Sequence, residues 1–384
     1  VAKDLQLLCD ARHVIPKEQY GFRKQSNCKS TLISVVDQWS AAVDSGKLVG
    51  TLLLDISKAF DTIPHQRLLL DLQAIGCDQT ALCWFLSYLS DRKQRVVTRE
   101  GPSGWKAVSR GVPQGSCLSP LLFNIFVREL PLSTTSSCLQ FADDTTLSES
   151  DRSLDVVKLK LARSYHEVSD FFSQKGLSLN ATKTQFMVVK AASKRVPDNL
   201  AIDLGLVTIP ALTSVKLLGV VLDRHLTFAE HVRITVQQCQ GLLGALRRAA
   251  PSLPRVLLRL AYIALVRTRL EYCCGVFIAM AKTHCTRLEV VQKIASRIIC
   301  QAPCYAHSAP LLDELRLDTL ESRRIKHVCS IVAHCLQGHG HPTLQSYFNC
   351  SDDGRVIDTT TPVTSYGRKR FRRIAAQLYN SSLQ

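Results

Sequence analysis

The spacing of apolar residues along the first part of the chain predicts alternating helices and strands. Apolar positions over 29–45 and 153–174 recur with helical spacing, and each stretch ends near a glycine, so two amphipathic helices are expected. The apolar runs at 49–54 and 184–189 are too short for stable helices and predict buried strands. The other elements predicted here are helices over 66–90, broken at Gly76, and over 119–130, hairpins over 94–108, around Gly101 and Pro102, and over 139–147, and a strand over 215–222.

From about residue 226 onward, nearly all of the apolar residues recur with helical spacing. The clearest helices are predicted over 229–249, 254–269, 287–299 and 320–336. The end of the chain carries a cluster of basic residues interleaved with Tyr366 and Phe371. Arginine beside aromatic rings can stack on bases and contact phosphates, whereas a solvated basic helix face is the alternative. The basic residues of this tail are Arg368, Lys369, Arg370, Arg372 and Arg373.

Charge and composition narrow the class of protein. The chain has 384 residues, with 48 Lys and Arg against 32 Asp and Glu, which favours a polyanionic partner, although a merely soluble basic protein has the same balance. No apolar run reaches the roughly 18 residues of a membrane helix, so no membrane partner is expected. The 15 cysteines are scattered among apolar neighbours, which is typical of reduced thiols in an intracellular protein. The Cys and His residues between Cys300 and His341 match no standard zinc spacing, so zinc is not expected.

Three carboxylates stand at the ends of predicted strands. Asp55 follows the apolar run 49–54, and Asp143 and Asp144 form a doublet at the tip of the hairpin 139–147. A carboxylate beside buried strand residues is costly unless it is paired or bound to a metal. Three such groups could hold two Mg²⁺ ions, with Mn²⁺ as an alternative, for an in-line phosphoryl displacement. A polar Asp-Asp surface turn is the competing interpretation.

A glycine- and proline-containing loop over 110–120 lies between these two carboxylate sites and leads into a predicted helix. Segments 52–61, 110–120 and 141–144 resemble, in this order, motifs A, B and C of reverse transcriptases. Segment 176–184 resembles motif D of LINE-type elements, and 216–223 resembles motif E. Gln19 to Arg23 is similar to the last stretch of the fingers, and segments after 269 resemble the C-terminal region of Jockey-like elements. The chain therefore resembles the C-terminal part of the polyprotein of a LINE-type (non-LTR, Jockey-like) retrotransposon.

This resemblance implies an α+β fold in which a right-hand polymerase palm with partial fingers is followed by an all-α thumb and C-terminal region. The implied division is 1–48 for the partial fingers, 49–225 for the palm, 226–345 for the helical thumb and connection, and 346–384 for the basic tail. The upstream fingers and the endonuclease of the family do not occur in this sequence. A truncated copy or a partial sequence is therefore expected.

The resemblance also implies roles for individual residues. Asp55 and Asp143 are expected as the main metal ligands, with Asp144 as the second member of the doublet, and Lys183 as a proton donor to the leaving pyrophosphate. Phe60 is expected as a steric gate against a ribose 2′-hydroxyl, a core aromatic being the alternative. The other expected contacts are the backbone of Ile56 and Ser57 with the triphosphate, Gln114 and Gly115 with template and nucleotide, and Arg23 with a phosphate.

The implied function is RNA-directed DNA polymerisation with an RNA template, a DNA primer and dNTPs. Target-primed synthesis would take place in the nucleus, and assembly with RNA in the cytoplasm. The alternative is a catalytically impaired truncated copy that acts only as a nucleic-acid-binding protein. An RNA-directed RNA polymerase is a further alternative, against which Phe60 and the Asp143-Asp144 doublet argue. No feature of the sequence indicates an oligomeric state.

Overall fold

The computed structural model describes residues 1–351 and 354–383 and divides into two compact units. The first unit comprises 1–27, 48–188 and 196–212, and the second comprises 28–47, 189–195 and 213–384. No helix in the described part of the chain is long and apolar enough to cross a membrane.

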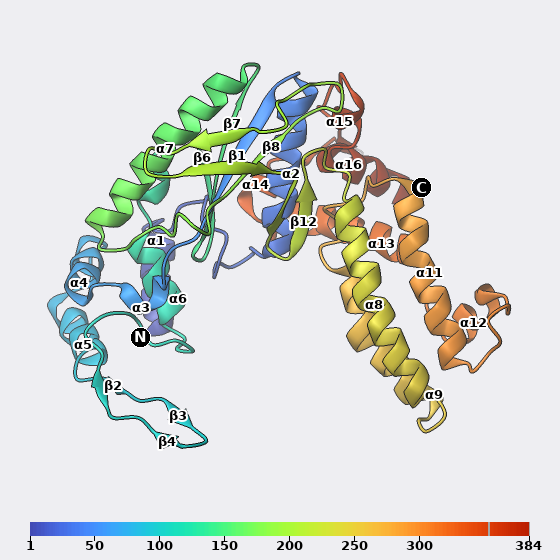
Figure 1. Ribbon diagram of the computed structural model, residues 1–384, viewed down its shortest axis with the longest axis horizontal. Helices are drawn as coiled ribbons and strands as arrows, with labels where there is room; N and C mark the ends of the chain where they lie inside the picture. Colours follow the sequence, from blue (N-terminus) through green and yellow to red (C-terminus); the bar gives the residue numbers. More distant parts are fainter. Residues whose placement is uncertain (352–353, 384) are drawn as a thin grey trace. The chain divides into compact units, whose positions relative to one another are not determined.

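A six-stranded sheet forms the centre of the first unit (Figure 1). The apolar run predicted as a strand is β1 (Leu48–Leu54), which pairs antiparallel with β7 (Asp144–Asp151) from Leu48 opposite Asp151 to Leu54 opposite Thr145. The interior position of β1 explains its nearly continuous apolar sequence, since both of its faces are covered. The strands lie in the order β6 (Ser137–Phe141), β7, β1, β8 (Gln185–Val189), β10 (Thr208–Leu212) and β9 (Ala201–Asp203).

Helix α7 (Leu154–Gln174) packs on this sheet with the apolar side that its sequence predicts. Val157, Leu161 and Phe172 are fully buried there. Gly50 in β1 permits the close approach, because a Cβ atom at this position would lie 2.4 Å from the Val157 side chain. The other helices of the unit are α1 (Ala2–Ala11), α3 (Ala59–Thr62), α4 (His65–Ala74), α5 (Gln79–Leu89), α6 (Ser119–Phe126) and the short η1 (Leu130–Leu132). Helix α6 is thus shorter than the predicted 119–130.

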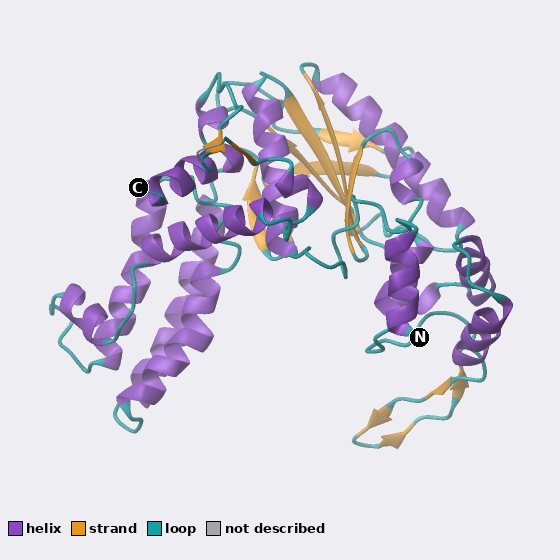
Figure 2. Cartoon of the chain, turned by 180° about the vertical axis from the view of Figure 1, so that it is seen from behind, coloured by secondary structure: helices purple, strands orange, loops and turns teal. Residues whose placement is uncertain are grey.

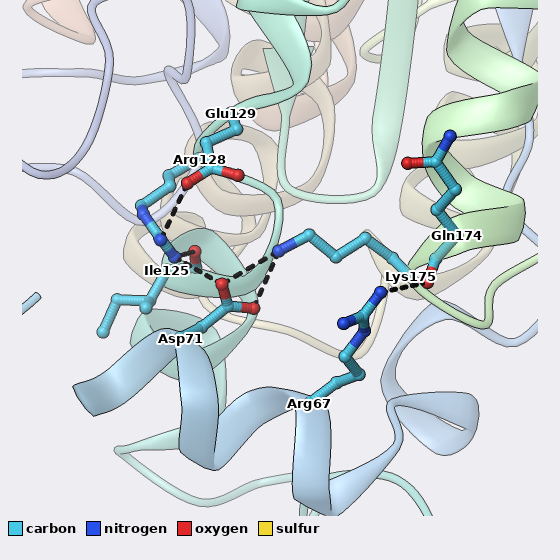
Figure 3. Close-up of polar contacts among 7 residues, drawn as sticks. All are labelled: Arg67, Asp71, Ile125, Arg128, Glu129, Gln174 and Lys175. Carbon is cyan, nitrogen blue, oxygen red and sulfur yellow. Dashed lines mark hydrogen bonds and ion pairs between the residues drawn. The ribbon is translucent and has the colours of Figure 1, made fainter. Parts of the chain in front are cut away.

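A buried ion-pair network links α4 with the chain beyond α6 and α7 (Figure 3). The Asp71 carboxylate lies 2.9 Å from an Arg128 guanidinium nitrogen and 2.8 Å from the Lys175 ammonium nitrogen. All three side chains are close to nine-tenths buried. The Lys175 ammonium also lies 5.1 Å from the centre of the Phe126 ring. This network holds the residue that immediately precedes segment 176–184.

The predicted hairpin over 94–108 is a thin ribbon of four short strands, β2 (Lys93–Gln94), β3 (Val97–Thr98), β4 (Gly101–Pro102) and β5 (Lys106–Ala107). It extends beyond the end of α5 in both views (Figures 1 and 2). The prediction of a turn at Gly101 and Pro102 is wrong, because these residues pair with Thr98 and Val97. The chain reverses at Arg99 and Glu100 instead.

The second unit is mainly helical, as predicted for the residues after 226, and its segment from Thr213 onward begins with a hairpin. The single strand expected over 215–222 is two strands, β11 (Ser214–Leu217) and β12 (Val220–Asp223), because Leu218 and Gly219 both take left-handed backbone conformations. The helices that follow are α8 (Ala229–Ala249), α9 (Arg255–Ala261), the π-helical η2 (Tyr262–Arg267), α10 (Thr268–Glu271), α11 (Lys282–Ile299), α12 (Ser308–Glu314), α13 (Leu320–Leu336), α14 (Pro342–Gln345), α15 (Ser365–Arg368) and α16 (Phe371–Ser382). A two-stranded sheet of β13 (Asn349–Cys350) and β14 (Val356–Ile357) lies among them.

Helix α2 (Cys28–Asp44) belongs to the second unit, whereas residues 1–27 belong to the first, so the residues predicted as partial fingers (1–48) are divided between the two units. Its Asp37 carboxylate, only 1% exposed, lies 2.8 Å from the Arg370 guanidinium. Its Asp44 carboxylate accepts hydrogen bonds from the Thr364 amide at 2.6 Å and from the Val363 amide at 3.1 Å. These contacts with the end of the chain explain why α2 groups with residues more than 300 positions away.

The same contacts show that part of the predicted basic tail is ion-paired within the second unit. Arg370 and Arg372 both lie beside Asp37, and Arg373 lies 2.9 Å from the Asp358 carboxylate. Their charges are used within the fold. The exposed basic residues of the tail are Arg368 and Lys369.

Candidate active site

Asp55 lies directly after β1, where the chain forms a short bridge with the segment that follows α7. The Asp55 carbonyl accepts a hydrogen bond from the Asn180 amide at 2.8 Å, and the Ser57 amide donates to the Ser178 carbonyl at 3.0 Å. Between these bonds, Ile56 pairs with Leu179. The segments that resemble motifs A and D therefore lie side by side, although more than 100 residues separate them in sequence. The Ser57 N–H, expected to face a triphosphate, is engaged in this bridge.

Lys183 reaches Asp55 from the turn that follows this bridge. The amides of Lys183 and Thr184 each donate to the Asn180 carbonyl at 3.1 Å, which closes the turn. The Lys183 ammonium nitrogen then lies 3.4 Å from an Asp55 carboxylate oxygen. Both side chains are well exposed, so the pair adds little to stability. Its position leaves the ammonium group accessible to a ligand at the Asp55 carboxylate.

The Asp143-Asp144 doublet lies at the same end of the sheet. Asp144 begins β7 opposite Phe141, and the next residue, Thr145, pairs with Leu54. Asp55 and Asp144 are the residues next to this Leu54–Thr145 pair, at the same end of the two strands. Burial raises the pKa of Asp144, and the charges of Asp143 and Asp55 raise it further, so the three carboxylates lie within electrostatic range of one another.

These three carboxylates are the residues that could hold a metal ion. Carboxylate oxygens are the ligands that hard divalent cations prefer, and a cation would relieve the repulsion that raises the pKa of Asp144. Over residues 1–351 and 354–383, no three His, Cys, Asp or Glu side chains are already arranged as a chelating group. The donor set thus fits such an ion in chemistry, and closure around the ion would require the side chains to turn toward it.

A buried glutamine holds the turn that carries the doublet. The Gln19 side-chain oxygen accepts from the Ala142 amide at 3.1 Å and from the Gly21 amide at 2.8 Å, and its nitrogen donates to the Ala142 carbonyl at 3.3 Å. Asn124 in turn donates to the Gly21 carbonyl at 2.9 Å. The roles of Gln19 and Asn124 were not predicted from the sequence. Gln19 stands in a segment that the family resemblance had singled out, but nothing local indicated its partner.

The loop that resembles motif B is bound to the segment after Asp55. The Gly111 amide donates to the Ile63 carbonyl and the Val112 amide to the Phe60 carbonyl, both at 2.8 Å. Gly111 has a φ of +84°, and a Cβ atom there would lie 2.6 Å from the Asp61 carbonyl oxygen, so only glycine fits without rearrangement.

Two expected contact residues follow Gly111 in this loop. The Gln114 side-chain nitrogen donates to the Asp61 carboxylate at 2.8 Å. Gly115, also at positive φ, has open space around the position of a Cβ atom. Both residues are exposed and available to a ligand.

Phe60 packs against the core aromatic Phe123, and its role as a steric gate stays a prediction. Its ring stacks on Phe123 with 4.8 Å between the ring centres and meets Phe22 edge-on at 6.5 Å. The side chain is half-buried, so one part is anchored in the core while another part remains accessible. A ring held in this way can act as a rigid wall.

Arg23 has a partner away from the carboxylates. Its guanidinium donates to the Pro16 carbonyl at 2.6 Å, and the side chain is half-buried. In the described part of the chain, its hydrogen bonding does not connect it with Asp55, Asp143 or Asp144. Arg23 therefore stabilises the N-terminal segment, and a phosphate contact stays a prediction.

Comparisons with known proteins identify the family of the chain. The family model for reverse transcriptase (RNA-dependent DNA polymerase) matches residues 1–222. The chain is 26% identical over 341 residues to a probable RNA-directed DNA polymerase from transposon BS of Drosophila melanogaster, covering 85% of this chain and 37% of that protein. It is 28% identical over 328 residues to the RNA-directed DNA polymerase from mobile element jockey of the same species, covering 81% of this chain and 35% of that protein. The chain thus spans about a third of the length of these relatives.

Among solved structures, telomerase from Candida tropicalis matches 82% of this chain and 56% of its own, with a TM-score of 0.43 and 13% identity. The resemblance to Jockey-like elements predicted from the motifs is confirmed by the curated relatives. Since the family model covers more than half of the chain, including all three carboxylates, the chain belongs to the reverse transcriptase (RNA-dependent DNA polymerase) family.

Proposed function

We propose that this chain is the RNA-directed DNA polymerase of a LINE-type retrotransposon and adds dNTPs to a DNA 3′-hydroxyl on an RNA template. The observation that carries the proposal is the placement of Asp55, Asp143 and Asp144 at one sheet end, with Lys183 3.4 Å from Asp55. Curated relatives named as RNA-directed DNA polymerases support it. Synthesis primed by chromosomal DNA would occur in the nucleus, and assembly with RNA in the cytoplasm.

Asp55, Asp143 and Asp144 would hold two divalent ions, Mg²⁺ or Mn²⁺, which when bound supply activation of the 3′-hydroxyl and neutralisation of the pyrophosphate charge. Lys183 would bind beside the triphosphate once Asp55 turns to its metal. Its ammonium group could then give a proton to the leaving pyrophosphate oxygen. The exposure of the Lys183–Asp55 pair supports this exchange of partners.

Substrate selection would depend on Phe60 and on the loop 110–116. The Phe60 ring, held by Phe123, would collide with a ribose 2′-hydroxyl and so favour dNTPs. Gln114, oriented by Asp61, and the open backbone at Gly115 would lie along the template and nucleotide. Gln114 and Gly115 are both exposed, so a ligand can reach them.

Primer extension on poly(rA)/oligo(dT) with Mg²⁺ and dTTP tests the proposal. The chain should incorporate dTTP, Asp143→Ala should abolish incorporation, and Asp155→Ala on the exposed face of α7 should leave it unchanged. A version carrying upstream family sequence separates two explanations of an inactive chain. Activity only in the longer version would mean that the chain needs further segments, whereas inactivity of both would leave a nucleic-acid-binding protein without polymerase activity.

A further inference from the structure

The ribbon over residues 92–108 lacks a hydrophobic core of its own. Every residue from Lys93 to Ala107 is exposed except Gly101, which is half-buried. Three large apolar side chains, Val96, Val97 and Trp105, are between 61% and 71% exposed. A two-stranded hairpin without a packed face is only marginally stable, and its exposed apolar side chains are available to a partner.

The side chains of the ribbon have the chemistry of a surface that binds nucleic acid. The Arg95 guanidinium lies 4.6 Å from the centre of the Trp105 ring in a cation–π contact. Such a pair offers a flat face on which a base can stack and a charge that can meet a phosphate. The ribbon contains a single acidic residue, Glu100, against five basic ones: Arg92, Lys93, Arg95, Arg99 and Lys106.

A cavity at the base of the ribbon connects it with the loop that resembles motif B. The cavity has a volume of about 720 Å³ and lies between the ribbon and the loop that contains Gln114. Its charged lining residues are four basic residues and one acidic residue, namely Lys58, Arg92, Lys93, Arg110 and Asp61. Basic groups thus continue from the loop that contains Arg110 and Gln114 onto the ribbon.

We propose that the ribbon binds the single-stranded template RNA that has not yet been copied, with Trp105 stacking on a base and Arg95 contacting the backbone. The inference rests on the proposed function, because it takes the loop 110–116 as the place where the template enters. A protein partner would also cover the exposed valines. The excess of basic residues and the Arg95–Trp105 pair favour a polyanion with aromatic bases.

The test uses the double variant Arg95→Ala/Trp105→Ala. The matched control, Arg152→Ala/Leu159→Ala, removes one basic and one exposed apolar side chain from the region of α7. Fluorescence anisotropy with a labelled single-stranded RNA of about 20 nucleotides, without dNTPs, measures binding. We expect affinity about tenfold lower for the ribbon variant and unchanged for the control. The salt dependence of binding should also become less steep for the ribbon variant.

Primer extension then locates the contact on the template. The ribbon variant should be impaired on templates with a long single-stranded overhang and match the unmodified chain when the overhang is only about two nucleotides. Equal RNA affinity of all three proteins would overturn the inference and leave the ribbon as a surface for protein. So would an equal loss of affinity in the control.

The two proposals fail in different ways. If the chain incorporates dTTP but the ribbon variant binds RNA normally and is indifferent to overhang length, only the ribbon inference fails. If the chain never incorporates dTTP but the ribbon variant loses RNA affinity, RNA binding by the ribbon stands and the polymerase proposal fails. Replacing 95–105 by a short glycine-containing turn provides a second variant, which should reproduce the double variant.

Discussion

The side chain of Gln19 hydrogen-bonds both the amide and the carbonyl of Ala142, the residue immediately before Asp143. Ala142 has a φ of 57°, a left-handed conformation that costs a non-glycine residue roughly 1–2 kcal/mol. Gln19 is 1% exposed, so its hydrogen bonds are shielded from water. A buried side chain from the N-terminal segment thus offsets backbone strain at the turn that aims the aspartate doublet.

Gln19→Leu should therefore lower the rate of dTTP incorporation by about tenfold or more, because misplacement of a reacting group by a small distance is costly. The concentration of Mg²⁺ required for half-maximal activity should rise as well, an effect that simple destabilisation would not produce. Adding Ala142→Gly should recover part of the rate, because glycine adopts the left-handed conformation without support. A Gln19→Leu protein with unchanged kinetics and metal requirement would show that the turn at Ala142 keeps its conformation without Gln19.

Lys183→Met should reduce incorporation by about a hundredfold if the ammonium group donates a proton to the pyrophosphate. Lys183→Arg should keep the charge beside the triphosphate but remain slow, because guanidinium is a very weak acid. Single-turnover rates with dTTP measure both variants. Full activity of Lys183→Arg would mean that only the positive charge matters.

Asp71→Asn should destabilise the first unit by about 3 kcal/mol, because the buried Arg128 and Lys175 would lose their common counterion. Urea denaturation followed by circular dichroism measures the loss. Asp155→Asn, at an exposed position of α7, is the matched control and should change stability by less than about 0.5 kcal/mol. Equal effects of the two variants would show that the network around Asp71 contributes nothing particular.

Arg370→Ala should destabilise the second unit by about 2 kcal/mol, because Asp37 is buried and would lose its nearer partner. RNA affinity should remain unchanged, since this guanidinium is used within the fold. Arg368→Ala removes an exposed charge from the same tail and should leave stability unaffected. Fluorescence anisotropy and thermal melts measure both variants. Weaker RNA binding by Arg370→Ala without a loss of stability would contradict the structural role of Arg370.

His231 should make the second unit sensitive to acid. Burial lowers the pKa of His231 from 6.5 to about 4, so the folded protein takes up its proton less readily than the unfolded chain. The contribution of the neutral ring is complete above pH 6.5 and is lost as the pH falls toward 4, about 3 kcal/mol in all. His231→Asn, which keeps an acceptor for the Val221 amide, should remove this pH dependence from the unfolding free energy. Identical pH profiles of the two proteins would contradict the assignment.

Local sequence patterns predicted most of the helices and strands that carry the candidate site. The strand before Asp55, the hairpin with Asp143 and Asp144 at its tip, and helices α2, α7, α8 and α13 all lie where periodicity places them. These features depend on neighbours in the chain, since burial of one face repeats with the period of the element itself. Errors occurred where a turn was involved, at Gly101 and Gly219, because the conformation of a few residues depends on how the flanking strands pair.

The sequence alone determined which residues could carry the chemistry: three carboxylates at strand ends, a lysine after an amphipathic helix, and a glycine loop between them. Only the tertiary structure decided how they are held. It bound Gln19 to Ala142, bridged Asp55 to Asn180, and paired Arg370 of the basic tail with the buried Asp37. Such contacts join residues far apart in the chain. A single buried hydrogen bond or ion pair produces no periodic sequence pattern from which its partner could be predicted.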